Sequence, residues 1–563
     1  MAAIAAPPQN RWLFGPTRDL LFGCGGLYFI AFLIIAAIGP RMMEIVPEGL
    51  IPLGLVFTAV PHYGATLLRV YERSADRRTY AFFAVWASAL VWGVFVWGVY
   101  DLLVGSLLLT LYLSWSPWHY SGQNYGIGLM LLRRGGVRVT PEAKRLLYSS
   151  FFLSFLIVLF ATHAATPTAS YSPTPVSLSE SAYTYMPVGI PLGLLGPLLI
   201  VCAVGWIGTS VGALAILRRG ASWAELTPLL GVMTLQALWF AVPVLARATN
   251  LLQGVFPFSI QSISYMLLWY AFGHSLQYLW VTTYYATQTK TANLQPVYWL
   301  KSYLAGGALF AIPTFLFSPM ALGHHSFESG LGMLIASAVN LQHFVLDGAI
   351  WKLRDGRIAR ILLRRPEAGA AATTTSSGWG RRLAWSTVAG LGIAYGAFYL
   401  VGIWEIERGF RRAVDPPNPA RMRTAAERLS WVGHDHPAIH LNLGILAVRD
   451  GDLDLGEREA KRSIALGPSV SAHLLLGQIH SQRKQWAEAR RDFEAALAID
   501  PKHVPALSQS ASVSAQLGDF ARAETELATA LSLAPTRQDL RNRLDQLRRQ
   551  RAASDANPTP PPS

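Results

Sequence analysis

The chain has 563 residues, of which 52% are hydrophobic and only 14% are charged. Ordinary soluble domains carry roughly 25% charged residues, so this composition excludes a protein that is water-soluble throughout. The net charge of +14 does not indicate nucleic-acid binding, because the arginines gather at the ends of apolar segments, where they meet anionic lipid headgroups. Membrane lipid, and no nucleic acid, is therefore the expected partner of the apolar part. The cysteines, Cys24 and Cys202, lie in apolar segments without metal-ligand or redox spacing, so we expect no disulfide framework.

Long apolar segments fill the chain up to its last third. Runs of about 20 apolar residues can cross a bilayer as helices. We therefore predict an all-α fold, in which a polytopic transmembrane bundle of about eleven spans precedes a soluble helical domain. The predicted spans lie near residues 19–38, 49–69, 80–99, 102–132, 146–162, 187–217, 226–246, 255–286, 302–318, 327–351 and 383–403.

Clusters of arginine and lysine predict the orientation of these spans, because such clusters favour the cytoplasmic side of a membrane. The clusters "RVYERSADRR", "RRGGVRVTPEAKR", "LRRG" and "WKLRDGRIARILLRR" alternate with arginine-poor connections. We predict a bacterial inner-membrane protein with a cytoplasmic N-terminus and an extracytoplasmic C-terminal domain. The side of the C-terminal domain depends on the last predicted span. The cationic segment "ERGFRR" follows that span on the predicted outer side, and the C-terminal domain is cytoplasmic if the span does not cross.

The C-terminal part of the chain repeats with a period of roughly 33 or 34 residues. Gly444 and Gly477 share one phase, and Pro468, Pro501 and Pro535 each close a unit. The pattern resembles the tetratricopeptide repeat family over about three units. This resemblance implies an α-solenoid whose concave surface binds a protein partner. The alternative is that the repeats only stabilise or dimerise the protein.

The changes of composition along the chain predict its division into domains. The expected order is a transmembrane domain over 1–365, a linker over 366–382, a final transmembrane helix over 383–403, a connector with a half repeat over 404–436, a repeat domain with a capping helix over 437–551 and a disordered tail over 552–563.

Four predicted spans carry a histidine, in "VPHYG" (His62), "PWHYS" (His119), "FGHSL" (His274) and "LQHFV" (His343). Ionisable groups at membrane depth are costly and usually face the bundle interior. All four spans run from outside to inside in the predicted topology, so their polar faces could converge. Counted along the helices, their depths differ, unless the spans of His119 and His274 extend past the headgroups. At ~1.5 Å per helical residue, His62 and His343 lie roughly 10 to 14 Å from the cytoplasmic end of the span, and His119 and His274 roughly 21 to 24 Å.

Amide, phenol and carboxylate side chains stand about one turn from these histidines, and residues i and i+4 share a helix face. Several imidazoles with a carboxylate and no thiolate suit iron, zinc or copper. Amides and phenols can orient the imidazole rings. We predict that the four histidines bind a metal ion, with iron favoured, and that Asp347 is a further ligand or an orienting group. The other candidates are Asp347 and Tyr278 as catalytic groups and Gln123, Asn124 and Gln277 as groups that orient the ligands of the cofactor.

A metal site enclosed by lipid favours substrates that reach it from the membrane. The sequence therefore predicts a non-haem, metal-dependent oxidoreductase acting on a lipid or isoprenoid. Three alternatives stay open. The histidines could be ordinary interhelical hydrogen bonders, two of them could bind a haem, or the bundle could be an assembly factor or scaffold that anchors the repeats.

The motif "VPHYGAT" resembles the proline-histidine-glycine motif of bacterial carotene-cleaving membrane dioxygenases. The resemblance implies that His62, His119 and His274 bind one iron and that the protein cleaves a polyene. The chain departs from that family at two places. The family has a second histidine four residues after a late one, where this chain has Tyr278, and it has an acid where this chain has alanine and threonine at residues 65–66.

The architecture also resembles multi-span enzymes that transfer sugars from lipid-linked donors and end in extracytoplasmic tetratricopeptide repeats. Such enzymes need acidic residues in the first outer loop to hold a metal and the acceptor. This chain offers only Glu44 and Glu48 there.

Overall fold

The computed structural model describes residues 11–38, 53–71, 80–165, 181–250, 260–288, 295–350 and 378–556. Helices dominate these residues, and the β-pairing found among them is one isolated bridge between Ala164 and Ile190. The all-α fold class is confirmed. The chain divides into two compact units. One comprises Met1–Val176, Tyr183–Phe315 and Met333–Ile403, and the other Ser177–Ala182, Leu316–Gly332 and Trp404–Ser563.

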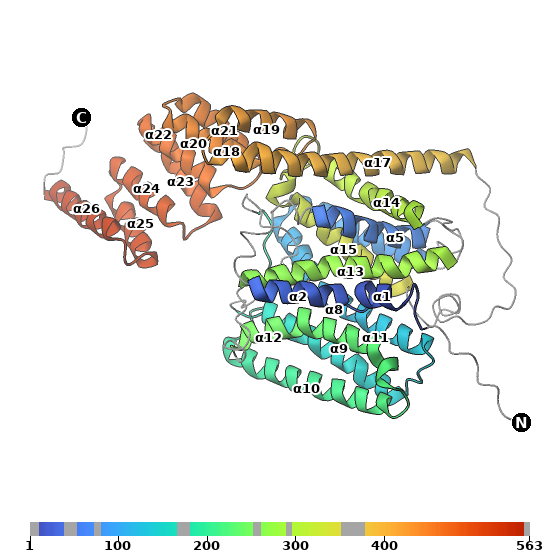
Figure 1. Cartoon of the computed structure of the whole chain (residues 1–563). Helices are drawn as coiled ribbons and strands as arrows, with labels where there is room; N and C mark the ends of the chain where they lie inside the picture. Colours follow the sequence, from blue (N-terminus) through green and yellow to red (C-terminus); the bar gives the residue numbers. More distant parts are fainter. Residues whose placement is uncertain are drawn as a thin grey trace, which may run out of the picture. The chain divides into compact units, whose positions relative to one another are not determined.

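Every predicted span coincides with a helix or a helix combination in the part of the chain that the structure describes (Figure 1). Several of these helices contain a π-helical segment, written η. In chain order the elements are α1 (Pro16–Arg18), η1 (Asp19–Gly23) and α2 (Gly26–Ile38); η3 (Leu55–Ala59) and α5 (Val60–Tyr71); η4 (Phe82–Ala87) and α7 (Ser88–Tyr100); α8 (Leu102–Arg134); α9 (Pro141–Thr162); α10 (Leu192–Arg218); α11 (Trp223–Gln236), η5 (Ala237–Ala241) and α12 (Val242–Thr249); α13 (Ile260–Gln288); α14 (Gln295–Leu316); η6 (Phe327–Leu331) and α15 (Gly332–Ile350); and α17 (Trp379–Trp404).

Within the described residues, six helices are long and apolar enough to cross a membrane by length and composition, or seven if the bent pair Pro16–Gly23 and Gly26–Ile38 is one span. This number is smaller than the eleven spans expected from the sequence. Three of the other predicted spans, α5, α8 and α13, carry His62, His119 and His274. Polar groups that face a bundle interior lower the apolar character of a helix without preventing it from crossing a membrane.

Helices α8 and α11 of the first unit begin at identifiable capping residues. The Asp101 side chain accepts hydrogen bonds from two backbone N–H groups in the first turn of α8. Ser222 and Glu225 form a reciprocal capping box at the start of α11. Such caps satisfy N–H groups that have no partner within the helix. The long helix α8 packs against α7, α9 and α11. Helix α13 packs against α2 and α5 (Figure 1).

Two glycines allow α5 and α14 to approach at backbone distance. A Cβ atom at Gly64 would overlap the carbonyl oxygen of Ser302, and one at Gly306 would overlap the carbonyl oxygen of Val60. Small residues at helix contacts are the usual means of close packing between membrane helices. The depth and rotation of α5, and with them the position of His62, therefore depend on this crossing.

The second unit contains paired antiparallel helices, as expected of repeats. The first helices of three successive pairs begin at Pro437, Val470 and Val504, which are 33 and 34 residues apart. Before them lie η7 (Glu405–Arg411), α18 (Arg412–Val414) and α19 (Pro419–Trp431). The pairs are α20 (Pro437–Arg449) with α21 (Leu453–Leu466), α22 (Val470–Gln482) with α23 (Trp486–Ile499) and α24 (Val504–Gln516) with α25 (Phe520–Leu533), and α26 (Gln538–Ala556) follows them.

Small residues make the close helix contacts of the repeats. A Cβ atom at Gly477 would meet the ring of Phe493 on the paired helix at 2.5 Å. The final helix continues to Ala556, past the boundary expected at residue 551. Residues 366–377 of the expected linker and 557–563 of the expected tail lie outside the described residues.

Candidate metal centre

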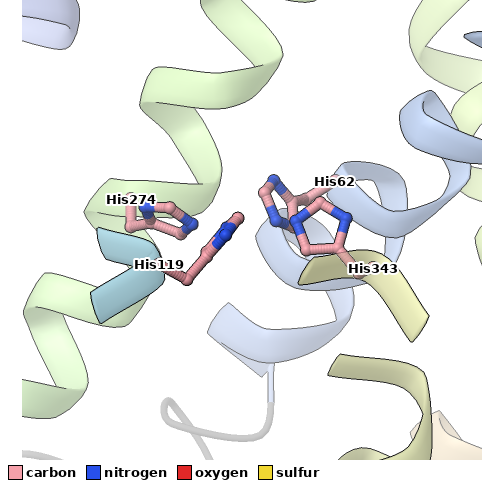
Figure 2. Close-up of side chains that lie close together, drawn as sticks. All are labelled: His62, His119, His274 and His343. Atoms are coloured by element: carbon pink, nitrogen blue, oxygen red, sulfur yellow. The ribbon is translucent and has the colours of Figure 1, made fainter. Parts of the chain in front are cut away.

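Four histidines from four helices converge on one place in the first unit (Figure 2). His62 on α5, His119 on α8, His274 on α13 and His343 on α15 each offer one ligand nitrogen, and these four atoms lie within 4.8 Å of one another. The different depths expected from the sequence do not keep them apart. Helices α8 and α13 have 33 and 29 residues, so counting residues from their predicted cytoplasmic ends did not give the position of their histidines relative to His62 and His343.

Each of the four imidazole rings lies next to two of the others. The ring centroids are 5.2 Å apart for His62 and His274, 5.0 Å for His274 and His119, 5.0 Å for His119 and His343, and 4.3 Å for His343 and His62. Neighbouring ring planes are inclined by 61° to 76°. The rings are therefore arranged edge to face around a common space and not stacked on one another (Figure 2).

The buried nitrogens of this group lack hydrogen-bond partners in the part of the chain that the structure describes. This holds for Nδ1 of His62, Nε2 of His119, both ring nitrogens of His274 and Nε2 of His343. Leaving a buried polar atom unsatisfied costs about 1–3 kcal/mol, and such atoms are uncommon in folded proteins. Direct hydrogen bonds between the helices therefore do not account for these nitrogens among the described residues, and their chemistry fits ligands of an ion.

Asp347 and Tyr278 lie next to this group and meet at a third side chain, Thr66. Tyr278 donates a hydrogen bond to Oδ1 of Asp347 at 2.9 Å. The Thr66 hydroxyl lies 2.6 Å from the Tyr278 hydroxyl, 3.0 Å from Asp347 Oδ1 and 3.0 Å from Nδ1 of His343. The group that could hold a metal ion comprises the four histidines, and Asp347 contacts this group at His343.

Thr66 was not among the residues predicted to serve the site. The local signal is its spacing from His62, because residues i and i+4 lie on one helix face. A threonine hydroxyl in a membrane helix commonly bonds its own backbone, so that spacing by itself does not distinguish Thr66 from other threonines of the bundle.

The predicted amides link helices to one another. Gln123 on α8 donates to the side chain of Gln277 at 2.7 Å and to the backbone carbonyl of His274 at 3.2 Å. Asn124 donates to the side chain of Gln236 on α11 at 2.8 Å. These bonds join α8 to α13 and α11. They thereby limit sliding of α8 along α13, which would separate His119 from His274. Among the described residues, the amides of Gln123, Asn124 and Gln277 bond to other amides, a phenol and backbone carbonyls, and not to imidazole nitrogens.

Aromatic rings surround the imidazoles. The Phe344 ring stacks on His119 with centroids 4.4 Å apart, and the Tyr120 ring lies 4.4 Å from that of His274. His62, His274 and His343 are buried, whereas His119 is half-buried. The site is therefore enclosed by apolar surface on most sides. Glu44 and Glu48, the acids of the sugar-transfer resemblance, lie outside the described residues.

The comparisons with known proteins concern the second unit. The model of the tetratricopeptide repeat family matches residues 476–548. The C-terminal domain carries tetratricopeptide repeats. The crystal structure of YrrB, a tetratricopeptide-repeat protein with an unusual peptide-binding site, aligns with 17% identity and a TM-score of 0.21, over 29% of this chain and 81% of that chain. A likeness of this size carries no argument about what this repeat domain binds. No curated protein sequence matched the chain.

Proposed function

We propose that this protein is a multi-pass membrane oxidoreductase in which His62, His119, His274 and His343 bind one metal ion, with iron favoured. The observation that carries the proposal is the group of buried, unpartnered imidazole nitrogens within 4.8 Å of one another. Bonds of about 2.0–2.1 Å between metal and imidazole place adjacent ligand nitrogens about 3 Å apart and opposite ones about 4 Å apart. The four rings would therefore bind an ion after shifts of about 1 Å.

The arrangement favours a small ion over a haem. A haem iron takes protein ligands along one axis, and its macrocycle occupies the plane between them. Each of the four imidazole rings here has its centroid within 5.2 Å of two others. A macrocycle held by any two of these rings would overlap the remaining two.

Among small ions, the ligand set favours one that keeps open coordination positions. Imidazole suits iron, zinc and copper alike, but a tetrahedral zinc with four protein ligands is closed and structural. Iron can take two ligands beyond the four histidines, and when bound it would supply redox chemistry towards a substrate at those positions.

The surroundings of the site favour an apolar substrate. Tyr120, Tyr278 and Phe344 place their rings 4.4 to 4.5 Å from the imidazole rings, and this enclosure excludes bulk water. Trp115, one turn before the half-buried His119, is 37% exposed on the surface of α8. We therefore infer that an acyl chain or an isoprenoid approaches from the membrane along α8.

The proposal places the bundle in a bacterial inner membrane and the repeat domain on its outer side, where the repeats bind a protein partner. The predicted outer connection Leu316–Gly332 belongs to the same compact unit as the repeats. The backbone N–H of Ser326 donates to the carbonyl of Leu466 at 2.6 Å, and the Glu328 carboxylate lies 2.7 Å from Nε2 of His434. These bonds support the proposal that this connection and the repeats lie on the same side of the membrane.

The metal is tested first, on full-length protein purified in detergent without a polyhistidine tag. We expect about one iron per chain by elemental mass spectrometry, and its loss when His62, His119, His274 or His343 is changed singly to Gln. His163→Gln is the matched control, because His163 is buried but hydrogen-bonded at both ring nitrogens, to Ser114 and to the backbone of Val188. Protein without metal, a haem absorption band, or iron retained in all four variants would refute the proposal.

The reaction is tested second. Iron-loaded protein is incubated aerobically with acyl lipids and with isoprenoids, and products are sought by mass spectrometry. We expect oxidised product from one of the two classes, and none from His119→Gln. Iron-loaded protein that converts neither class would leave the metal site standing and refute the oxidoreductase function.

A further inference from the structure

The Thr66 hydroxyl occupies an unusual position beside the histidine group, because three functional side chains meet at it. Its oxygen lies 3.0 Å from Nδ1 of His343, 3.0 Å from Oδ1 of Asp347 and 2.6 Å from the hydroxyl of Tyr278. Thr66 is 1% exposed, so no solvent competes for these bonds. The three partners come from α13 and α15, whereas Thr66 itself lies on α5.

The number of bonds that a hydroxyl can make decides the direction of each bond. A threonine hydroxyl donates one hydrogen and accepts up to two. The ionised Asp347 carboxylate can only accept, and both Thr66 and Tyr278 donate their single hydroxyl hydrogen to it. With the Thr66 hydrogen used in this way, the contact between Thr66 and Nδ1 of His343 is a hydrogen bond only if the nitrogen donates to the Thr66 oxygen. Nδ1 of His343 therefore carries a hydrogen.

A hydrogen on Nδ1 leaves Nε2 of a neutral imidazole with its lone pair free. Nε2 of His343 is the nitrogen without a hydrogen-bond partner among the described residues, although it lies 3.3 Å from Oδ2 of Asp347. A free lone pair is what a metal ligand requires. The bond to Thr66 thus selects the form of His343 that can bind an ion through Nε2.

We propose that Thr66 is a positioning residue of the metal centre, whose hydroxyl fixes the ring orientation and the tautomer of His343 and joins it to Asp347. This inference rests on the proposed metal site. Groups that bond the second nitrogen of a ligating histidine raise the affinity for the metal, and their loss typically costs about 10–100-fold. Asp347 and Tyr278 both contact this hydroxyl and are hydrogen-bonded to each other.

The test compares Thr66→Val, which keeps the branched shape and removes the hydroxyl, with Thr66→Ser, which keeps the hydroxyl. Full-length, metal-free protein in detergent is titrated with Fe(II) against a competing chelator, and with Co(II), whose visible spectrum reports the ligand geometry. We expect Thr66→Val to bind Fe(II) about 10–100-fold more weakly with an altered Co(II) spectrum, and Thr66→Ser to match the unchanged protein in both measurements.

Thr58→Val is the matched control on the same stretch of helix, because the Thr58 hydroxyl donates to the carbonyl of Gly54 and not to the site. We expect its Fe(II) affinity to be unchanged. Thr66→Ala, which is smaller and meets no steric limit, replaces Thr66→Val if that variant does not fold. Equal affinity and equal spectra in the hydroxyl-free variants would overturn the role of Thr66 alone. An unchanged protein that binds neither Fe(II) nor Co(II) would overturn the metal site and this inference together.

Discussion

Nε2 of His343 and Oδ2 of Asp347 lie 3.3 Å apart, one turn from each other on α15. Both side chains are buried, and Asp347 is held there by Thr66 and Tyr278 from two other helices. In the proposed site Nε2 of His343 binds the ion, so Oδ2 of Asp347 lies beside the ligating nitrogen, whereas the contact of Asp347 that can orient the ring runs through Thr66 to Nδ1. A measurement on Asp347 therefore distinguishes the two roles that the sequence leaves open, those of ligand and of orienting group.

Asp347→Asn should weaken Fe(II) binding by about 10–100-fold while the protein still binds one ion, because an orienting group is altered and all four imidazoles remain. Chelator competition measures the affinity, and the Co(II) spectrum measures the ligand geometry. Asp101→Asn is the control, since Asp101 only caps the start of α8. A complete loss of bound ion would instead make Asp347 a ligand.

Removing the metal should destabilise the bundle. A ligand that binds only the folded state at about 100 times its dissociation constant adds about 2.7 kcal/mol of stability. We therefore expect a membrane-permeant chelator to lower the Tm of the detergent-solubilised protein and added Fe(II) to restore it. The same chelator should leave the Tm of His274→Gln unchanged. A chelator effect of equal size in both proteins would contradict a site that contains His274.

Gly64→Ala should separate α5 from α14 and displace His62, because its new methyl group would overlap the Ser302 carbonyl. Overpacking of this kind costs about 1–3 kcal/mol. We expect a lower Tm together with reduced Fe(II) binding. Gly122→Ala on α8 is the control, since a Cβ atom there meets nothing within 4 Å. If Gly64→Ala matches that control in Tm and in bound iron, the crossing does not position His62.

The stability of the repeat domain should depend on the protonation of His440. Burial lowers the pKa of His440, but hydrogen bonds and charges from Asp435 and Glu459 outweigh burial and raise that pKa to about 9. The two carboxylates lie 2.9 Å and 2.6 Å from its ring nitrogens. Because the folded pKa exceeds the ordinary value of 6.5, the stabilisation is complete below about pH 6.5 and is lost as pH rises through about 9.

Thermal unfolding of the full-length protein between pH 6 and pH 10 checks this expectation. The transition of the repeat domain should shift to lower temperature as the pH approaches about 9 and passes it, since the deprotonated imidazole loses its charge and can donate to only one of the two carboxylates. His440→Gln should have a lower Tm at pH 6 and lack this part of the pH dependence. An identical pH profile in the two proteins would contradict the assignment.

Labelling of single introduced cysteines should place the repeats on the side of the connection Leu316–Gly332. Met320→Cys and Arg449→Cys occupy exposed positions of that unit, 66% and 61% accessible, and Glu142→Cys lies at 61% in a predicted cytoplasmic connection. An impermeant maleimide added to spheroplasts should label the first two, and should label Glu142→Cys only after permeabilisation. The native cysteines are buried. If Met320→Cys is labelled and Arg449→Cys is not, the repeats and the connection do not lie on the same side of the membrane.

The helical segments, the repeat domain and the four histidines could be predicted from the sequence because each corresponds to a pattern of neighbouring residues. Apolar runs set the helices, and the recurrence of Gly444 and Gly477, with a proline closing each unit, sets the repeat period. A histidine inside an apolar helix is conspicuous at any position. The tetratricopeptide assignment, made on this basis, is confirmed by the match over residues 476–548.

The convergence of the histidines was decided only by the tertiary structure. Counting residues from helix ends placed His119 and His274 at other depths than His62 and His343, because the sequence does not record how far each helix slides along its neighbours. That offset depends on distant contacts, such as the crossing at Gly64 and the amide bonds between α8 and α13. The meeting of Thr66, Tyr278 and Asp347 has the same origin, since it joins side chains from three helices. Periodicity describes one helix at a time, whereas the packing of helices selects which faces meet.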